Sequence, residues 1–119
     1  MKNVKDQVST ALNEVFENVS DQYPKDFSDL PAVQYVEEEN RVHEHTKRGE
    51  TKSYVRYRID IWNNRSASQA ALDVDKALSA LGLVRTSCQD APDPSGWKHK
   101  IMRYEAIIDM ESDLVYWTN

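Results

Sequence analysis

Two adjoining stretches decide the expected fold: YVRYRIDIW at residues 54–62, and SASQAALDVDKALSAL at residues 66–81. One face of the first stretch carries Val55, Tyr57, Ile59 and Ile61, and the other carries Tyr54, Arg56, Arg58, Asp60 and Trp62. This period of two predicts a strand with one face on the core and a polar second face with aromatic ends. Apolar residues recur at helical spacing in the second stretch. There Ser66 opens a Ser-x-x-Gln capping box, and Gly82 is the expected helix stop.

The segment before this unit predicts a helix and a first strand. Apolar residues recur every three or four positions from Val4 to Val19, with Asn3 as the N-cap, and the helix should end before Tyr23-Pro24. A strand follows from about residue 32 to 43, and its inward residues are either Val33 and Tyr35 or Gln34 and Val36. Residues 46–50 are the expected turn into the strand at 54–62.

The segment after the unit predicts two more strands. They cover residues 83–89 and 97–110, with a turn-rich connection between them, and residues 114–117 form a short strand or a strap. The expected order is therefore α-β-β-α-β-β in one α+β domain spanning residues 1–119. We expect an antiparallel or mixed four-stranded sheet, two helices packed on one of its faces, and a projecting hairpin at about residues 37–52.

Composition narrows the function classes. The chain has 119 residues, with 20 acidic and 15 basic side chains and a net charge of −5, so it lacks the overall basic footprint of a nucleic-acid binder. Cys88 is the single cysteine, which excludes an intrachain disulfide and fits a reducing compartment. The sequence shows neither a signal peptide nor a run of about 20 apolar residues, so a soluble cytoplasmic chain without membrane contact is expected.

No motif predicts catalysis or a cofactor. His43 and His45 could share a strand face as metal ligands, but a third ligand is not evident, and a solvated strand end is the favoured interpretation. The triplet Glu37-Glu38-Glu39 should alternate between faces, so at most two of its carboxylates converge, and a charged rim or intersubunit surface is favoured. Cys88 is interpreted as a small packing residue. We expect no enzyme activity, no cofactor and no metal.

Basic residues suggest a stripe along the sheet. It would comprise Lys52, Arg56, Arg58, Lys98, Lys100 and Arg103. Interleaved tyrosines are typical of RNA-binding sheets. Charge pairing between strands explains the same residues more simply, because acidic side chains outnumber basic ones. Such a face would serve equally well where basic residues of one subunit meet acidic residues of the next.

The unit at residues 54–82 resembles the tail-completion, or tail-terminator, proteins of long-tailed bacteriophages. The resemblance rests on a strand of the form hydrophobic-x-Asp-hydrophobic-Trp, seen here in Tyr57-Arg58-Ile59-Asp60-Ile61-Trp62. The turn Asn63-Asn64-Arg65-Ser66 and an alanine-rich helix follow this strand. Leu30-Pro31-Ala32-Val33-Gln34-Tyr35 also matches the way the first strand begins in that family. The order of elements agrees over most of the chain, whereas the hairpin at residues 37–52 is longer and more charged.

The resemblance implies a structural protein of a virion or prophage, without catalytic residues. Such proteins form a ring, commonly hexameric, that caps the tail tube and joins it to the head connector, with DNA passing through. Their location is the tail or neck of the virion, after assembly in the host cytoplasm. The candidate intersubunit residues are Glu37, Glu38, Glu39, Arg41, Lys47, Arg48, Arg56, Arg58, Asp60 and Trp62. The alternatives are a nucleic-acid-binding module that uses the sheet face and a small ligand-binding domain.

Overall fold

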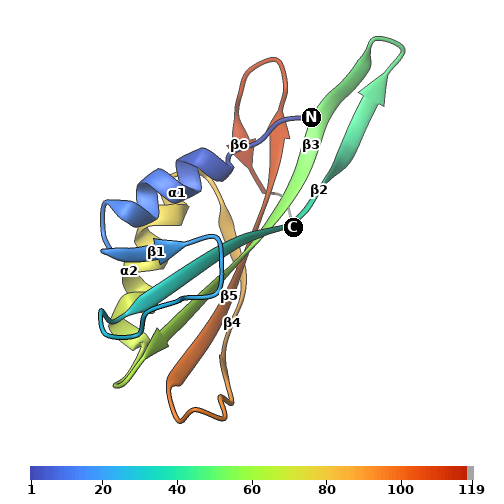
Figure 1. Ribbon diagram of the computed structural model, residues 1–119. Helices are drawn as coiled ribbons and strands as arrows, with labels where there is room; N and C mark the ends of the chain where they lie inside the picture. The colour runs from blue at the N-terminus through green and yellow to red at the C-terminus, as the bar shows by residue number, and fades with distance from the viewer. Residues whose placement is uncertain (118–119) are drawn as a thin grey trace.

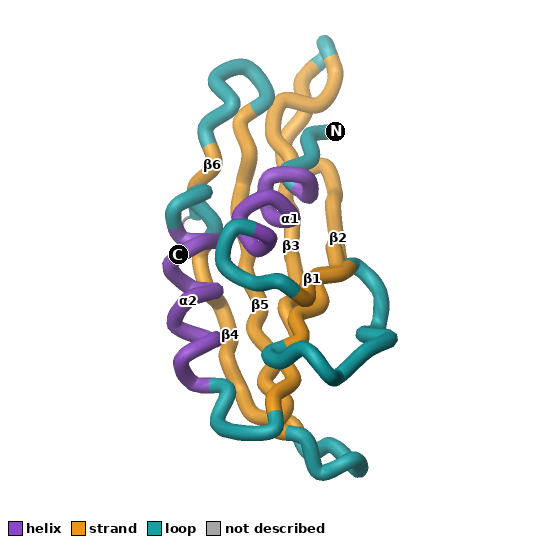
Figure 2. Tube along the Cα trace, turned by 60° about the vertical axis from the view of Figure 1, so that its left-hand side comes forward, coloured by secondary structure: helices purple, strands orange, loops and turns teal. Residues whose placement is uncertain are grey.

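Two helices pack on one face of a mixed sheet in a computed structural model that describes residues 1–117 (Figures 1 and 2). The elements are α1 (Lys5–Asn13), β1 (Asn18–Ser20), β2 (Ala32–Thr46), β3 (Gly49–Asn63), α2 (Ser68–Ser79), β4 (Val84–Ala91), β5 (Lys98–Asp109) and β6 (Val115–Tyr116). The strand order is β1-β2-β3-β5-β4, and β6 pairs with β5. Only the β1–β2 pairing is parallel among the described pairs. The expected α+β class is confirmed.

The expected four strands are present as β2, β3, β4 and β5, but the described sheet has six. β6 is the short terminal strand that was one of two alternatives for residues 114–117. The sequence does not predict β1, because Val19 continues the apolar spacing of the first helix. The backbone of Asn18–Ser20 instead pairs with Ala32–Gln34 at the start of β2.

The alternation in β3 sorts its side chains as predicted. Val55, Tyr57, Ile59 and Ile61 are fully buried and form one core with residues of both helices, so this side of the sheet is called the helix face. The opposite side, which carries Arg56 and Arg58, is called the open face. Both helices therefore cover one face, as expected. In β2, Val33 and Tyr35 join the core side, which resolves the register that the sequence left ambiguous.

The first helix is shorter than predicted. α1 ends at Asn13, and Val15 and Val19 lie beyond it. Asn3 lies one residue before the helix N-cap, Val4, and its Oδ1 still accepts the Lys5 N–H at 2.6 Å. Helical spacing alone could not locate the end, because pairing with β2 draws the following residues into a strand.

The capping box predicted at Ser66 is not formed. α2 begins at Ser68 with Ala67 as its N-cap, and Ser66 Oγ accepts the Ser68 N–H at 3.2 Å. Gln69 Nε2 donates to Asp73 Oδ1 at 3.1 Å. In a capping box, the Gln69 side chain would instead accept the backbone N–H of Ser66. The helix-stop prediction at Gly82 is supported by a positive φ of 89° directly after the last turn.

The β2–β3 hairpin gives the molecule its elongated shape of 52 × 24 × 22 Å (Figure 1). Its turn is tighter than the predicted residues 46–50, because β2 reaches Thr46 and β3 begins at Gly49. The projecting part also starts later than residue 37. Glu37 accepts a hydrogen bond from the Tyr57 hydroxyl, and Asn40 donates one to the Lys2 carbonyl, so both residues pack on the body of the molecule. The exposed part of the hairpin is residues 41–49.

Gly82 provides a direct test of the connection between α2 and β6. A Cβ there would lie 2.5 Å from the Val115 carbonyl oxygen, in addition to the cost of a side chain at φ 89°. Gly82→Ala should lower the free energy of unfolding by about 2 kcal/mol. Gly96 has a similar φ of 86° with nothing within 4 Å, so Gly96→Ala should cost only about 1 kcal/mol. Equal losses in urea denaturation would contradict a close approach at Val115.

Candidate functional site

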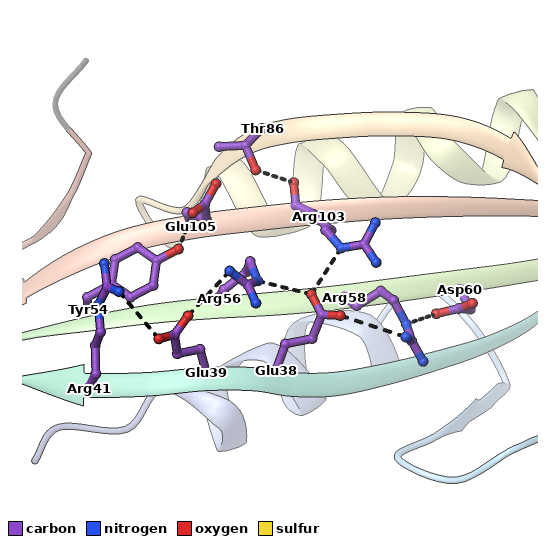
Figure 3. A network of polar contacts seen from close by, with 10 residues as sticks. All are labelled: Glu38, Glu39, Arg41, Tyr54, Arg56, Arg58, Asp60, Thr86, Arg103 and Glu105. Atoms are coloured by element: carbon purple, nitrogen blue, oxygen red, sulfur yellow. Dashed lines mark hydrogen bonds and ion pairs between the residues drawn. The ribbon is translucent and has the colours of Figure 1, made fainter.

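A β-bulge places two adjacent carboxylates on the open face (Figure 3). Glu37 pairs with Tyr57 and Glu39 pairs with Arg56, so Glu38 is the extra residue between them. A bulge interrupts alternation and re-aims side chains. Glu38 and Glu39 consequently lie together beside the arginines, and two carboxylates of the triplet converge, although simple alternation would have separated these two.

Glu38 is the centre of the network. Its Oε1 accepts hydrogen bonds from Arg103 Nε at 3.0 Å and Arg56 Nε at 3.2 Å, and Arg58 Nη1 lies 3.7 Å from its Oε2. The Glu38 side chain is 17% exposed, whereas the three arginines are about one-third exposed. One carboxylate thus gathers cations from two strands, β3 and β5.

The network continues in both directions along β3. Towards the hairpin, Glu39 pairs with Arg56 at 3.3 Å and with Arg41 at 3.4 Å. Arg41 also lies over the ring of Tyr54, 4.3 Å from its centroid, and the Tyr54 hydroxyl donates to Glu105. These contacts confirm the prediction that charges pair across the strands.

Asp60 ends the network at the opposite end of β3. It is 4% exposed, accepts from Arg58 Nε at 2.8 Å and lies 2.8 Å from His99 Nε2. Four arginines (Arg41, Arg56, Arg58 and Arg103) thus face four carboxylates (Glu38, Glu39, Asp60 and Glu105). The described network is therefore balanced in charge.

Two opposing effects set the pKa of Glu38. Burial raises it, but the hydrogen bonds and positive charges of Arg103 and Arg56 outweigh burial and hold the pKa below its ordinary value of 4.5. The folded chain therefore binds this proton less tightly than the unfolded chain does. The resulting stability is present above pH 4.5 and is lost as the pH falls through the lower folded-state pKa.

Acid should consequently weaken the fold through Glu38. We expect the free energy of unfolding, measured in urea between about pH 7 and about pH 3, to fall more steeply for the native chain than for Glu38→Gln. The amide keeps the size of the side chain but cannot titrate. Parallel pH profiles of the two proteins would contradict this assignment.

An aromatic cluster covers the open face around Trp62. The Trp62 ring stacks on His99 with centroids 4.5 Å apart, and Tyr23 and Phe27 meet it edge-on. Its Nε1–H donates to Asp93 Oδ2 at 3.1 Å. Trp62 is only 4% exposed as a result, so within this chain it anchors the loop after β1 to the sheet.

The structure does not gather all the candidate intersubunit residues. Arg41, Glu38, Glu39, Arg56, Arg58 and Asp60 meet in the network. Glu37 lies on the helix face, where its Oε1 accepts from the Tyr57 hydroxyl at 2.9 Å. Lys47 and Arg48 form the exposed turn of the hairpin.

Four members of the network and its surroundings are absent from the candidate intersubunit residues. The sequence places Arg103 only in the basic stripe and Tyr54 only among the interleaved tyrosines, and it predicts no role for His99 or Glu105. Three of these residues sit on β5, and strand pairing decides which β3 residue each one faces. The register between β3 and β5 cannot be read from the sequence alone. It sets the pairs Arg56–Glu105, Arg58–Arg103 and Trp62–His99.

Other candidate chemistry stays separate from the network. Cys88 is exposed on β4, so the prediction of a packing residue is wrong, because the strand lies at an edge of the described sheet. Within residues 1–117, no group of three or more His, Cys, Asp or Glu residues could hold a metal ion.

A hollow of about 680 Å³ lies between the start of α2 and residues 90–100. None of the helices in the described part of the chain is both long and apolar enough to cross a membrane.

The fold and the network define a class: a two-layer α+β protein whose sheet face opposite the helices carries matched ion pairs. Neither the comparison with protein-family models nor the search of curated proteins found a match to this chain.

Proposed function

We propose that this chain is a structural, non-enzymatic subunit of a phage or prophage head–tail junction. In this role copies of the chain form a ring, commonly hexameric in the family it resembles. The ring completes the tail tube, joins it to the head connector and lets DNA pass through. Its place is the neck of a virion, after assembly in the host cytoplasm.

The observation that carries the proposal is the unit formed by β3 and α2. The sequence that resembles the tail-completion proteins includes Ile59-Asp60-Ile61-Trp62. These residues lie at the end of β3, just before the connection to α2. Asp60 and Trp62 lie on the open face there, and both are held by contacts to His99. The resemblance thus falls on residues with defined structural roles.

Two surfaces support assembly with other chains. The hairpin projects past the body, and its residues 41–49 are exposed, so it is placed to contact a neighbour (Figure 2). The open face offers partly exposed arginines beside carboxylates, an arrangement that favours specific orientation of a charged partner over simple hydrophobic association.

The direct test is addition of the purified chain to tail tubes assembled from a tail-tube protein of the same phage or prophage. We expect electron microscopy to show the chain as a ring at one end of each tube, and binding to the head-connector protein in a pull-down. A chain that binds neither protein, whether as a monomer or as an oligomer, would overturn the proposal.

Nucleic-acid binding is the second candidate, because four arginines share one sheet face with Tyr54. The four carboxylates beside them oppose it, since phosphate binding depends on uncompensated positive charge. Retention on heparin that falls steeply with salt, and that is lost in Arg56→Glu, would favour this candidate. The proposed structural role predicts weak retention that this substitution barely changes.

A further inference from the structure

The hairpin is positively charged in a negatively charged protein. We call residues 41–52 the arm. It contains four basic and two acidic side chains, which gives +2, whereas the whole chain carries −5 and the rest therefore carries −7. Lys47 and Arg48 form the exposed turn, and neither makes an ion pair with any described residue. The tip thus presents two cations to the surroundings.

A groove with the opposite charge runs between α1 and α2. It consists of two adjoining hollows of about 440 and 480 Å³ that share Ala11, Glu14 and Leu81. Asp6, Glu14 and Asp73 supply its carboxylates, and none of the three is ion-paired among the described residues. Lys76 is the one basic side chain in its lining. Its apolar lining includes Val15, a large aliphatic residue that is 48% exposed.

The arm and the groove match in chemistry but lie apart in the molecule. Figures 1 and 2 show the arm leaving one end of the sheet and pointing away from the two helices on its face. The arm carries its own exposed aliphatic residue, Val42, at 52% exposure. Unpaired cations at the tip of the arm thus correspond to unpaired carboxylates in the groove, and each surface also carries one exposed valine.

We propose that the arm of one copy docks in the groove between α1 and α2 of a second copy. Lys47 and Arg48 at the arm tip would face Glu14 and Asp73, and the docked arm would cover Val15. Both partners bring charges that lack ion pairs within the described chain, so the contact gains electrostatic attraction without breaking existing pairs.

This contact joins two different surfaces, so each copy still has a free arm or a free groove after one contact forms. Head-to-tail contacts of this kind close into a ring when the rotation between copies allows it. The inference rests on the proposed function in that it supplies the subunit contact of the ring.

Charge reversal on each surface tests the contact. The arm variant is Lys47→Glu with Arg48→Glu, and the groove variant is Glu14→Lys with Asp73→Lys. Sedimentation velocity at low salt, up to about 1 mM protein, should show self-association of the native chain that weakens as salt is added. Each variant alone should associate about tenfold or more weakly, because like charges then face each other. An equimolar mixture of the two should associate again, since each reversed surface finds its complement.

Matched controls carry the same change of net charge at exposed positions outside both surfaces. Lys25→Glu with Arg65→Glu controls the arm variant, and Glu17→Lys with Asp29→Lys controls the groove variant. Both controls should associate like the native chain. Circular dichroism and thermal denaturation verify that all variants fold, as expected for surface substitutions.

Three results would overturn the inference. They are a native chain that stays monomeric over the whole concentration range, a charge reversal that leaves association unchanged, and a mixture that stays dissociated. The proposed function fails separately: association through arm and groove without tail-tube capping would reject the function alone. Capping that survives in both reversed variants would reject the inference alone.

Discussion

Replacing Trp62 by alanine should lower the free energy of unfolding by about 3–5 kcal/mol. The ring is 4% exposed and stacks on His99, with Tyr23 and Phe27 against its edges. Its removal leaves a cavity between the sheet and the loop after β1, and leaves Asp93 without its indole donor. Urea denaturation followed by circular dichroism measures the loss, and limited proteolysis of residues 21–31 should become faster.

Two variants separate the causes of this loss. Trp62→Phe retains an aromatic ring but removes the donor to Asp93, so it should cost clearly less than alanine does. Trp97→Ala removes a partly exposed ring that stacks on Phe27, and its expected cost is about 1 kcal/mol. If Trp62→Ala costs no more than Trp97→Ala, Trp62 is not the anchor of the cluster.

Replacing Glu38 by alanine should have the second largest effect, a loss of about 2–3 kcal/mol at neutral pH. Arg103 loses its one carboxylate partner in the described network, while Arg56 and Arg58 keep Glu39 and Asp60. Three guanidinium groups then face one another across β3 and β5. We expect a smaller loss of stability than for a fully buried ion pair, because the arginines are about one-third exposed and water screens their charges.

The adjacent residue is the matched control for Glu38. Glu39 lies on the same face, is about one-third exposed and contacts Arg56 and Arg41, so Glu39→Ala should cost less than about 1 kcal/mol. In a double-mutant cycle with Arg103→Ala, the Glu38 substitution should show a coupling energy of about 1 kcal/mol or more. Equal losses for the two glutamates would show that the bulge does not give Glu38 a special role.

The main effect of such an ion-pair network is to hold its side chains in fixed positions. Each arginine on the open face is fixed by a carboxylate, so a partner meets ordered guanidinium groups that lose little side-chain entropy on binding. Substitutions in the network should therefore affect both stability and partner binding. Substitutions at the arm tip should affect association with other chains and leave stability nearly unchanged.

Much of the fold could be predicted because the local signals agree with the tertiary contacts. The alternation of β3 matches its burial, and Gly82 ends α2 because only glycine readily adopts its φ. The prediction for residues 14–20 failed because Val15 and Val19 continue the helical spacing beyond Asn13. Pairing of β1 with β2 outweighs that local preference, and a contact between residues so far apart leaves no mark in the spacing.

The sequence by itself determined the α+β class, the strand–helix unit at its centre, the balance of charge and the expectation of cross-strand ion pairs. Periodicity and composition suffice for these features because each depends on side chains close together in the chain. Only the tertiary structure decided that Glu38 and Glu39 share a face and that Arg103 completes their network. It also placed unpaired carboxylates between α1 and α2 and unpaired cations at the tip of the projecting arm. These features depend on a bulge, a strand register and the packing of two helices, which are set by contacts between distant residues.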